Sequence, residues 1–172
     1  MYLDFKELLA ILNANNVRYL VVGGYAVSFH AQPRATKDPD LWVNPDLANA
    51  NALYSALAEF GVPLANLTPA DFAEAGSFFR MGTPPLMVDI LPEINGVDFD
   101  AAWSRRIEAP IDADSDVIAP FISADDLLAA KLATGRAQDL ADVVAIRAAQ
   151  GAAEQSRVTK PRRLPKKPRP KL

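Results

Sequence analysis

The spacing of hydrophobic residues along the chain predicts a mixture of helices and strands. Apolar positions recur every three or four residues in some segments, which is typical of helices with one buried face. They run consecutively in other segments, which is typical of buried strands. The predicted helices cover residues 5–15, 25–31, 44–60, 69–75, 98–106, 123–134 and 137–149. The predicted strands cover residues 18–22, 38–43, 77–81 and 86–91, with mixed strand and loop over 107–122.

These elements do not follow the regular strand–helix alternation of a doubly wound sheet. The expected fold class is therefore α+β, with a small mixed β-sheet flanked by helices and further helices at the C-terminus. At 172 residues the chain suits one globular domain, which we place at residues 1–150. Residues 151–172 are expected to form a disordered, basic, proline-rich tail.

Charge is distributed very unevenly between these two parts. All 21 acidic residues lie at or before Glu154, whereas 8 of the 18 basic residues lie between Arg157 and Lys171. Prolines in this stretch prevent a helix from continuing, and the stretch has little apolar surface to bury. We interpret it either as a solubilising terminus or as an arm that follows the phosphates of RNA or DNA, whose binding would weaken with salt.

Composition excludes several kinds of site. The chain has no cysteine and a single histidine, His30, so disulfides, thiolate nucleophiles and multi-histidine metal sites are ruled out. No apolar run is long enough to span a bilayer, and Asp4 and Glu7 fall where a signal peptide would need basic and apolar residues. These features predict a soluble cytoplasmic protein that has no membrane partner.

Three aspartates are the candidate metal ligands. Asp38 and Asp40 alternate within the predicted strand 38–43, so they should share one face with Cα atoms roughly 6.5 Å apart. Asp89 interrupts an otherwise apolar strand. Carboxylates gathered in this way usually persist because a cation neutralises them, and Mg²⁺ prefers carboxylate and phosphate oxygens. The plainer interpretation is that Asp38 and Asp40 form a polar turn and that Asp89 is a paired structural acid.

Residues around these acids could hold a phosphate chain. Gly23 and Gly24 follow a strand and open a helix, so they offer free backbone N–H groups. Arg34 and Lys37 lie between this turn and the aspartates, where they could contact a triphosphate. Four charged residues on the C-terminal helices could face one side, although a solvated face is the ordinary explanation. They are Lys131, Arg136, Asp139 and Asp142. His30, Trp42 and Trp103 are interpreted as packing residues.

Taken together, these motifs resemble those of the nucleotidyltransferase superfamily. The order is a glycine turn (Gly23-Gly24), a basic residue with threonine (Arg34 to Thr36), an Asp-x-Asp pair (Asp38 to Asp40) and a later lone Asp89. The closing segment, 126–142, is similar to the final motif of the abortive-infection AbiEii-type nucleotidyltransferases and their smaller relatives. Those proteins are known as toxins of toxin–antitoxin systems. The resemblance covers residues 17–146.

The resemblance implies a role for each matching residue. Asp38 and Asp40 would bind Mg²⁺, and Asp89 would complete the metal site or activate the acceptor, so these three form the catalytic and metal-binding set. The nucleotide would be bound by Gly23, Gly24, Arg34, Thr36, Lys37, Lys131 and Asp139. Family members transfer a nucleoside monophosphate from an NTP to an acceptor and release pyrophosphate. Pro39 departs from the pattern, because an aliphatic residue usually stands between the two acids.

The sequence therefore favours a Mg²⁺-dependent nucleotidyltransferase, and two alternatives stay open. The basic tail makes RNA, tRNA in particular, the preferred acceptor over protein, and a cognate toxin or antitoxin protein is a possible partner. The first alternative is a catalytically weak or inactive binding module that keeps the fold, antitoxin-like or regulatory. The second is a structural domain whose acids are paired internally.

Overall fold

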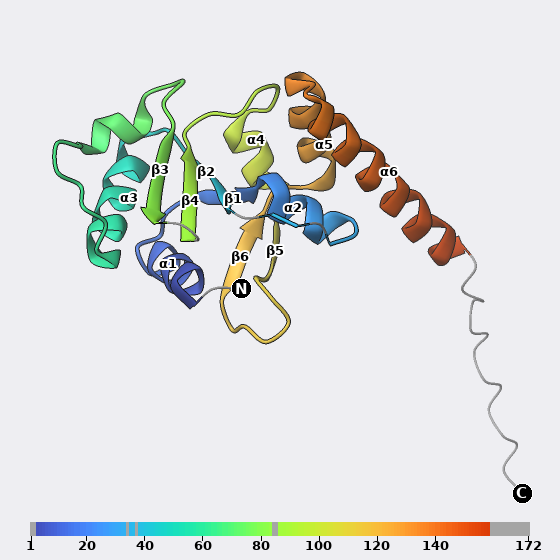
Figure 1. The fold of residues 1–172 in the computed structure, drawn as a ribbon, viewed down its shortest axis with the longest axis horizontal. Helices are drawn as coiled ribbons and strands as arrows, with labels where there is room; N and C mark the ends of the chain where they lie inside the picture. The colour runs from blue at the N-terminus through green and yellow to red at the C-terminus, as the bar shows by residue number, and fades with distance from the viewer. Residues whose placement is uncertain (1–2, 34, 37, 84–85, 159–172) are drawn as a thin grey trace, which may run out of the picture.

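The structure is a computed structural model that describes residues 3–33, 35–36, 38–83 and 86–158. Its strands are β1 (Tyr19–Val22), β2 (Asp40–Val43), β3 (Phe79–Thr83), β4 (Leu86–Leu91), β5 (Ile107–Pro110) and β6 (Ile118–Phe121). Its helices are α1 (Leu3–Ala14), α2 (Gly23–His30), α3 (Leu47–Phe60), α4 (Phe99–Ser104), α5 (Ala124–Thr134) and α6 (Ala137–Val158), with a short 3₁₀ helix η1 (Pro69–Ala73). Figure 1 shows their arrangement.

The strands form one mixed sheet in the order β3-β4-β2-β1-β6-β5. Strand β2 runs parallel to β4, β1 runs parallel to β6, and the other neighbouring pairs are antiparallel. A sheet with both kinds of pairing, covered by helices, confirms the predicted α+β class. Strand β2 lies between β4 and β1, so the segment predicted to carry the acids is central in the sheet rather than at its edge.

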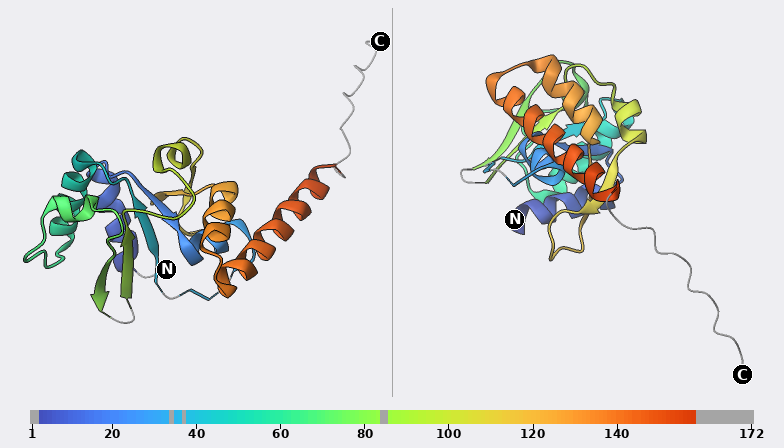
Figure 2. Two further views of the ribbon diagram at one scale, coloured as in Figure 1. Left: turned by 90° about the horizontal axis from the view of Figure 1, so that it is seen from above. Right: turned by 90° about the vertical axis from the view of Figure 1, so that its right-hand side faces the viewer.

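Each face of the sheet is buried under its own set of helices. Alternate residues of β1 point to opposite faces, as strand geometry requires. Tyr19 and Val21 belong to the core cluster with α1 and α3, whereas Leu20 and Val22 belong to the cluster with α2, α4, α5 and α6. The two sets of helices lie on opposite sides of the sheet in Figures 1 and 2. Trp42 is buried in the second cluster, as expected for a packing residue.

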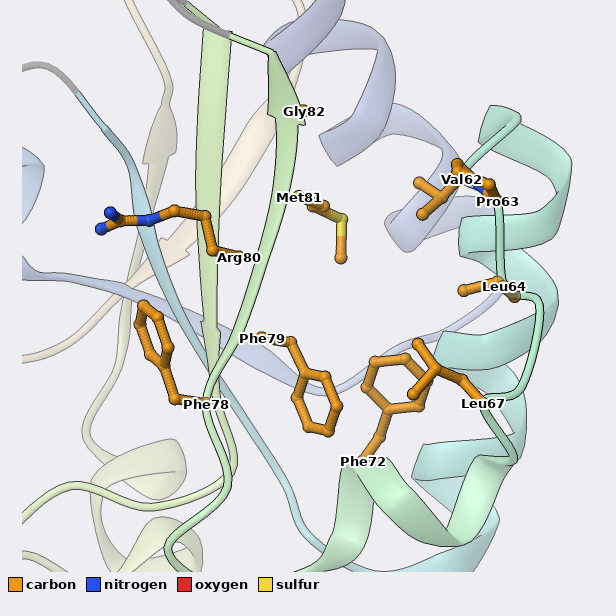
Figure 3. A pocket seen from close by; sticks show the side chains of 10 residues that line it. All are labelled: Val62, Pro63, Leu64, Leu67, Phe72, Phe78, Phe79, Arg80, Met81 and Gly82. Atoms are coloured by element: carbon orange, nitrogen blue, oxygen red, sulfur yellow. The ribbon is translucent and has the colours of Figure 1, made fainter.

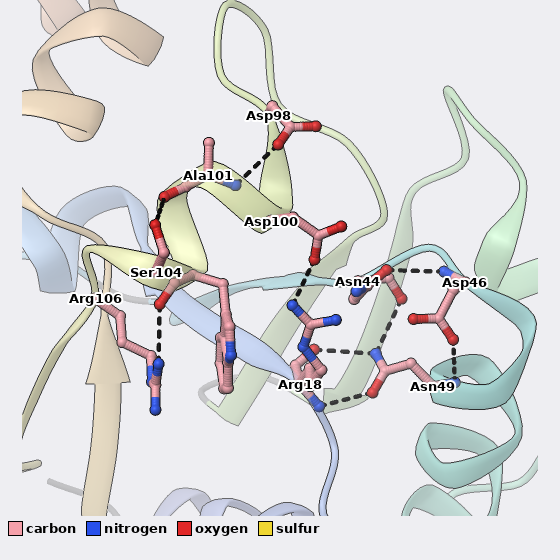
Figure 4. A network of polar contacts seen from close by, with 10 residues as sticks. Arg18, Asn44, Asp46, Asn49, Asp98, Asp100, Ala101, Ser104 and Arg106 are labelled. Carbon is pink, nitrogen blue, oxygen red and sulfur yellow. Dashed lines mark hydrogen bonds and ion pairs between the residues drawn. The ribbon is translucent and has the colours of Figure 1, made fainter.

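A buried asparagine connects the start of β1 to the end of β2. The Asn49 side chain accepts a hydrogen bond from the Arg18 backbone N–H at 2.7 Å and donates to the Arg18 carbonyl at 3.0 Å. It also donates to the Asn44 carbonyl at 2.9 Å (Figure 4). Asp46 caps the same helix by accepting from the Asn49 backbone N–H. These bonds fix helix α3 to the two strands whose other ends form the candidate site.

The last helix is longer than predicted. The sequence predicted its end at residue 149, but α6 continues to Val158 and extends away from the sheet (Figures 1 and 2). Residues 151–158 are therefore helical, although the prediction had assigned them to a disordered tail; alanine and glutamine in this stretch favour helix over coil. Residues 159–172 lie outside the described residues, so the domain boundary at 150 stays a prediction.

Membrane insertion by a helix is not supported in the described part of the chain. None of its helices is both long and apolar enough to cross a bilayer.

Candidate active site

Two of the three predicted acids lie side by side on neighbouring parallel strands. Asp40 begins β2 and is the register partner of Asp89 in β4. The Asp89 backbone N–H donates to the Pro39 carbonyl at 2.9 Å, which extends the pairing by one residue. Pro39 precedes the strand and contributes only its carbonyl, so its missing N–H removes no ladder bond that this pairing uses. The departure at Pro39 therefore does not disturb the alignment of Asp40 with Asp89.

Asp38 is placed differently from the prediction. The predicted strand 38–43 begins at Asp40, and Asp38 lies in a bend before it. The expected alternation of Asp38 and Asp40 within one strand is therefore wrong, because pairing with β1 starts only at Asp40. The charge of Asp38 still acts on its neighbour, since it is one of the causes that raise the pKa of Asp40.

Gly23 allows the glycine turn to approach Asp40 very closely. Its backbone φ is +58°, in the left-handed region that favours glycine. A Cβ atom on this residue would lie 1.9 Å from Oδ2 of Asp40, so no larger side chain fits without moving the carboxylate. The turn and the acid therefore form one unit: the backbone of β1 and α2 closes directly over the start of β2.

We expect Gly23→Ala to lower the free energy of unfolding by about 2 kcal/mol, because a left-handed alanine alone costs roughly 1–2 kcal/mol. The clash with Asp40 adds to that cost. Urea unfolding measures the effect. Gly151→Ala is the matched control: a Cβ there would meet no atom within 4 Å outside its own helix turn, so the change should be neutral or slightly stabilising. Equal stability of the two variants would contradict the close packing at Gly23.

The Asp40 carboxyl is electrostatically unfavourable in its charged form. Burial, followed by the negative charge of Asp89, raises the pKa of Asp40 to about 6. The positive charge of Lys131 and a hydrogen bond from the Gly24 backbone N–H oppose this rise without cancelling it. A carboxylate in this position is a good ligand for a cation, because a bound cation would compensate both the burial of its charge and the repulsion from Asp89.

Asp89 is held by an arginine that the sequence reasoning did not select. Arg80 in β3 is the register partner of Asp89, and its Nε and Nη2 donate to the two carboxylate oxygens at 2.7 Å each. The charges of Asp38 and Asp40 also raise the pKa of Arg80, after the larger effects of its hydrogen bond and charge contact with Asp89. The sequence reasoning could not find this pair, because counting outward from the predicted hairpin loop at 82–85 places Arg80 opposite Met87. The strands instead continue to Thr83 and Leu86, and this register sets Arg80 opposite Asp89.

A buried charge network lies on the other side of Asp40. Lys131 in α5 donates to Asp139 at 2.9 Å and contacts Asp142 at 2.7 Å, both in α6. Arg136 contacts the second oxygen of Asp139 at 2.7 Å. Burial raises the pKa of Asp139, but the hydrogen bonds from Arg136 and Lys131 outweigh it and leave the pKa below its ordinary value. The expectation of a solvated face is wrong for Lys131, Asp139 and Asp142, which are all buried.

Asp40 and part of this charge network line one cleft of about 360 Å³, whereas Asp38, Arg80, Asp89 and Asp142 are not part of its lining. Its polar lining comes from the glycine turn, from Asp40, and from the helix α5–α6 junction. Its apolar lining includes Leu91, Ile94, Leu127 and Ala130. The cleft therefore brings together Gly23, Gly24, Asp40, Lys131 and Asp139 from the predicted site. A cavity with a charged end and an apolar wall suits a ligand that has both a charged and an apolar part.

The remaining predicted residues do not line the cleft or cannot be placed. Thr36 is half-buried in the loop before β2 and is not part of the lining. Arg34 and Lys37 lie outside the described residues. His30 donates through Nε2 to the Ile122 carbonyl at 2.7 Å and packs against Phe29, as expected for a packing residue.

The glycine turn, Asp40 and the α5–α6 junction thus meet at one cleft of a mixed α+β fold. Residues 3–150 match a family described as "Nucleotidyltransferase of unknown function (DUF6036)", and the chain belongs to that family. This confirms the resemblance to the nucleotidyltransferase superfamily. The family's description specifies neither the nucleotide nor the acceptor.

Curated proteins and solved structures give two further comparisons. No curated protein matches the chain at a significant level. Among solved structures, the chain is similar to the antibiotic-resistance factor ANT(2'')-Ia, whose solution structure is described as revealing substrate-regulated conformation dynamics. The two share 14% sequence identity with a TM-score of 0.48, over 91% of this chain and 96% of that chain.

Proposed function

We propose that this protein transfers a nucleoside monophosphate from an NTP to an acceptor in a Mg²⁺-dependent reaction. The observation that carries the proposal is the pairing of Asp40 with Asp89 on neighbouring strands, directly against the Gly23 turn. Membership of a nucleotidyltransferase family supports it. Asp40, Asp89 and Asp38 are the proposed metal ligands, and Gly23, Gly24, Lys131 and Asp139 are the proposed nucleotide-binding residues within the described part of the chain.

The residues fit a hard divalent cation. The proposed ligands supply only carboxylate oxygens, which Mg²⁺ prefers. Burial and then the charge of Asp89 raise the pKa of Asp40, and a bound cation would oppose both effects. Within the described residues, no three acidic or histidine side chains are grouped closely enough to form a complete site. Asp89 is engaged in its ion pair with Arg80, and Asp38 lies in a bend before the strand.

The chain's own residues divide the work of phosphoryl transfer. Backbone N–H groups at the start of α2 would orient phosphate oxygens, and Lys131 and Arg136 would supply positive charge at the other wall of the cleft. The apolar wall formed with Leu127 and Ile94 would hold the nucleoside and exclude water. Bound Mg²⁺ would neutralise charge that develops on the transferred group.

RNA, with tRNA as the favoured form, is the acceptor that we propose, and protein is the second choice. The support is the run of 8 basic residues from Arg157 to Lys171, which contains no acid and would attract a polyanion. A toxin–antitoxin setting is part of the proposal through the resemblance of segment 126–142, and a cognate partner protein would then control the activity.

The test is a labelling assay on the full chain. The protein is incubated with Mg²⁺, total RNA or cell lysate, and each common NTP labelled at the α-phosphate. Label that enters RNA or protein, and that is absent with Asp38→Asn/Asp40→Asn, supports the proposal and identifies the nucleotide and acceptor class. The same NTP labelled at the γ-phosphate should leave no label on the acceptor, because that phosphate departs in pyrophosphate.

A chain that ends at Val158 tests the proposed acceptor separately. If the basic tail docks RNA, the shortened chain should label RNA less well, and its remaining activity should depend less on salt. Unchanged labelling by the shortened chain would remove the tail from the proposal but leave the enzyme in place.

The alternative function is a binding module without catalytic activity. The specific observation in its favour is the ion pair between Arg80 and Asp89, which neutralises one proposed metal ligand without a metal. It predicts a folded protein that binds no Mg²⁺–NTP and labels no acceptor with any nucleotide, so the same assay decides between the two functions.

A further inference from the structure

Arg80 forms an ion pair with Asp89, one of the proposed metal ligands. Both oxygens of Asp89 accept hydrogen bonds from the Arg80 guanidinium at 2.7 Å, in the two-pronged geometry that makes such pairs strong. The Asp89 side chain is 8% exposed and the Arg80 side chain 48% exposed. The acid is therefore fixed in the sheet, whereas the arginine is attached at the surface and can leave without disturbing the core.

The charges of all three proposed metal ligands, Asp38, Asp40 and Asp89, act on Arg80. Its pKa is raised mainly by the hydrogen bond and charge of Asp89, and further by the charges of Asp38 and Asp40. Lys131, the cation on the other side of Asp40, is already engaged by Asp139 and Asp142. The Arg80 guanidinium thus supplies, at this carboxylate, the positive charge that a divalent cation would otherwise supply.

We propose that Arg80 is a positioning residue that holds Asp89 in place and gives up this carboxylate when the Mg²⁺–nucleotide complex binds. The proposal rests on the proposed function, because it assigns a further residue to that site. The exchange follows from charge: a guanidinium and a divalent cation at the same buried carboxylate repel each other, and only the guanidinium has solvent to move into.

The surroundings of Arg80 allow this movement and limit its extent. Strand β3 is the edge strand of the sheet, so one side of it is not covered by another strand. Figure 3 shows Arg80 directed away from the apolar pocket into which Phe79 and Met81 point, so the guanidinium stays on the face of the acids. The centroid of the Phe78 ring lies 5.4 Å from Cζ of Arg80. This ring can hold the guanidinium at the mouth of the site after it leaves Asp89.

The test compares Mg²⁺ binding by wild type, Arg80→Met and Arg80→Lys, measured by calorimetry with MgCl₂ alone and with an NTP analogue that cannot be cleaved. Loss of a competing cation should tighten Mg²⁺ binding by Arg80→Met about tenfold, because hydrogen bonds to charged groups are the stronger kind. Arg80→Lys keeps the charge but loses the two-pronged contact, so an intermediate affinity is expected. If Arg80→Met does not fold, Arg80→Lys provides the comparison with wild type.

Arg106→Met is the matched control. Arg106 also pairs with an acid, Glu108 at 2.7 Å, and also lies over an aromatic ring, that of Trp103 at 4.1 Å, but it is not part of the acidic group. Its replacement should leave Mg²⁺ affinity unchanged. Melting temperatures give a second readout: Mg²⁺ should raise that of Arg80→Met more than that of wild type, which a purely structural role of Arg80 would not produce.

The outcomes separate this inference from the proposed function. Equal or weaker Mg²⁺ binding by folded Arg80→Met, in a protein that transfers nucleotides, overturns the role of Arg80 alone. Tighter binding by Arg80→Met supports it, including the case in which wild type binds Mg²⁺ too weakly to measure. If neither protein binds Mg²⁺ and no acceptor is labelled, both the inference and the proposed function are wrong.

Discussion

Replacing Asp40 by asparagine should reduce nucleotidyl transfer by at least about 10³-fold, because metal ligation in such sites stabilises the transition state by several kcal/mol. Asp40 is the acid that lies against the glycine turn and pairs in register with Asp89. Asparagine keeps the size and one oxygen acceptor but removes the charge that a divalent cation needs. The measurement is the initial rate of acceptor labelling at saturating NTP and Mg²⁺.

The same substitution should stabilise the protein in the absence of metal. In the folded state the pKa of Asp40 is raised to about 6, above its ordinary value, so the folded protein binds this proton more tightly than the unfolded chain does. The favourable contribution of the protonated form is therefore complete below about pH 4, falls as the pH rises, and is lost above about pH 6. Asp40→Asn does not ionise and escapes this loss.

Urea unfolding at pH 5 and pH 8 in a chelating buffer measures the difference. We expect the free energy of unfolding of Asp40→Asn to exceed that of wild type by about 2 kcal/mol at pH 8 and by clearly less at pH 5. Glu74→Gln, which removes an exposed charge outside the cleft lining, is the control, and its free energy of unfolding should equal that of wild type at both pH values. An Asp40→Asn protein that transfers nucleotides at the normal rate would exclude Asp40 as a metal ligand.

Much of the fold followed from the sequence because periodicity and end signals agreed. The apolar run at 86–91 became strand β4, and Asp46 and Gly61 mark the ends of helix α3 as cap and left-handed residue. The placement of Asp40 beside Asp89 was also within reach, since both belong to apolar strands that a small sheet must pair. The first residue of β2 could not be predicted, because strand pairing rather than residue pattern decides where the ladder with β1 begins.

The ion pairs around the site were harder to predict than the positions of Asp40 and Asp89. Arg80 looks like an ordinary surface residue until the hairpin register sets it opposite Asp89. Lys131 and Asp139 looked like one solvated face, because spacing along a helix does not tell which side packs against a neighbour when alanine occupies so many positions. Only the contact of α5 with α6 turns these charges inward and joins them into one network.

Lys131→Met should lower the free energy of unfolding by about 3 kcal/mol, because breaking a buried ion pair leaves its acids without their compensating charge. Both partners of Lys131 are nearly inaccessible, with side chains of Asp139 5% and Asp142 2% exposed. Methionine fills a similar volume, so the loss reflects charge rather than a cavity. For a chain of this size the melting temperature should fall by about 6–12 °C.

A double variant separates the charge network from the rest of the site. If the cost of Lys131→Met comes from uncompensated acid, Lys131→Met/Asp142→Asn should regain part of the lost stability, although each change removes a charged residue. Thermal melts of the single and double variants in chelating buffer provide the comparison, each started at a temperature where the least stable variant is still folded. A single variant that melts with wild type would mean that the α5–α6 contact is held by its apolar residues. Lys131 would then be kept for the nucleotide rather than for the fold.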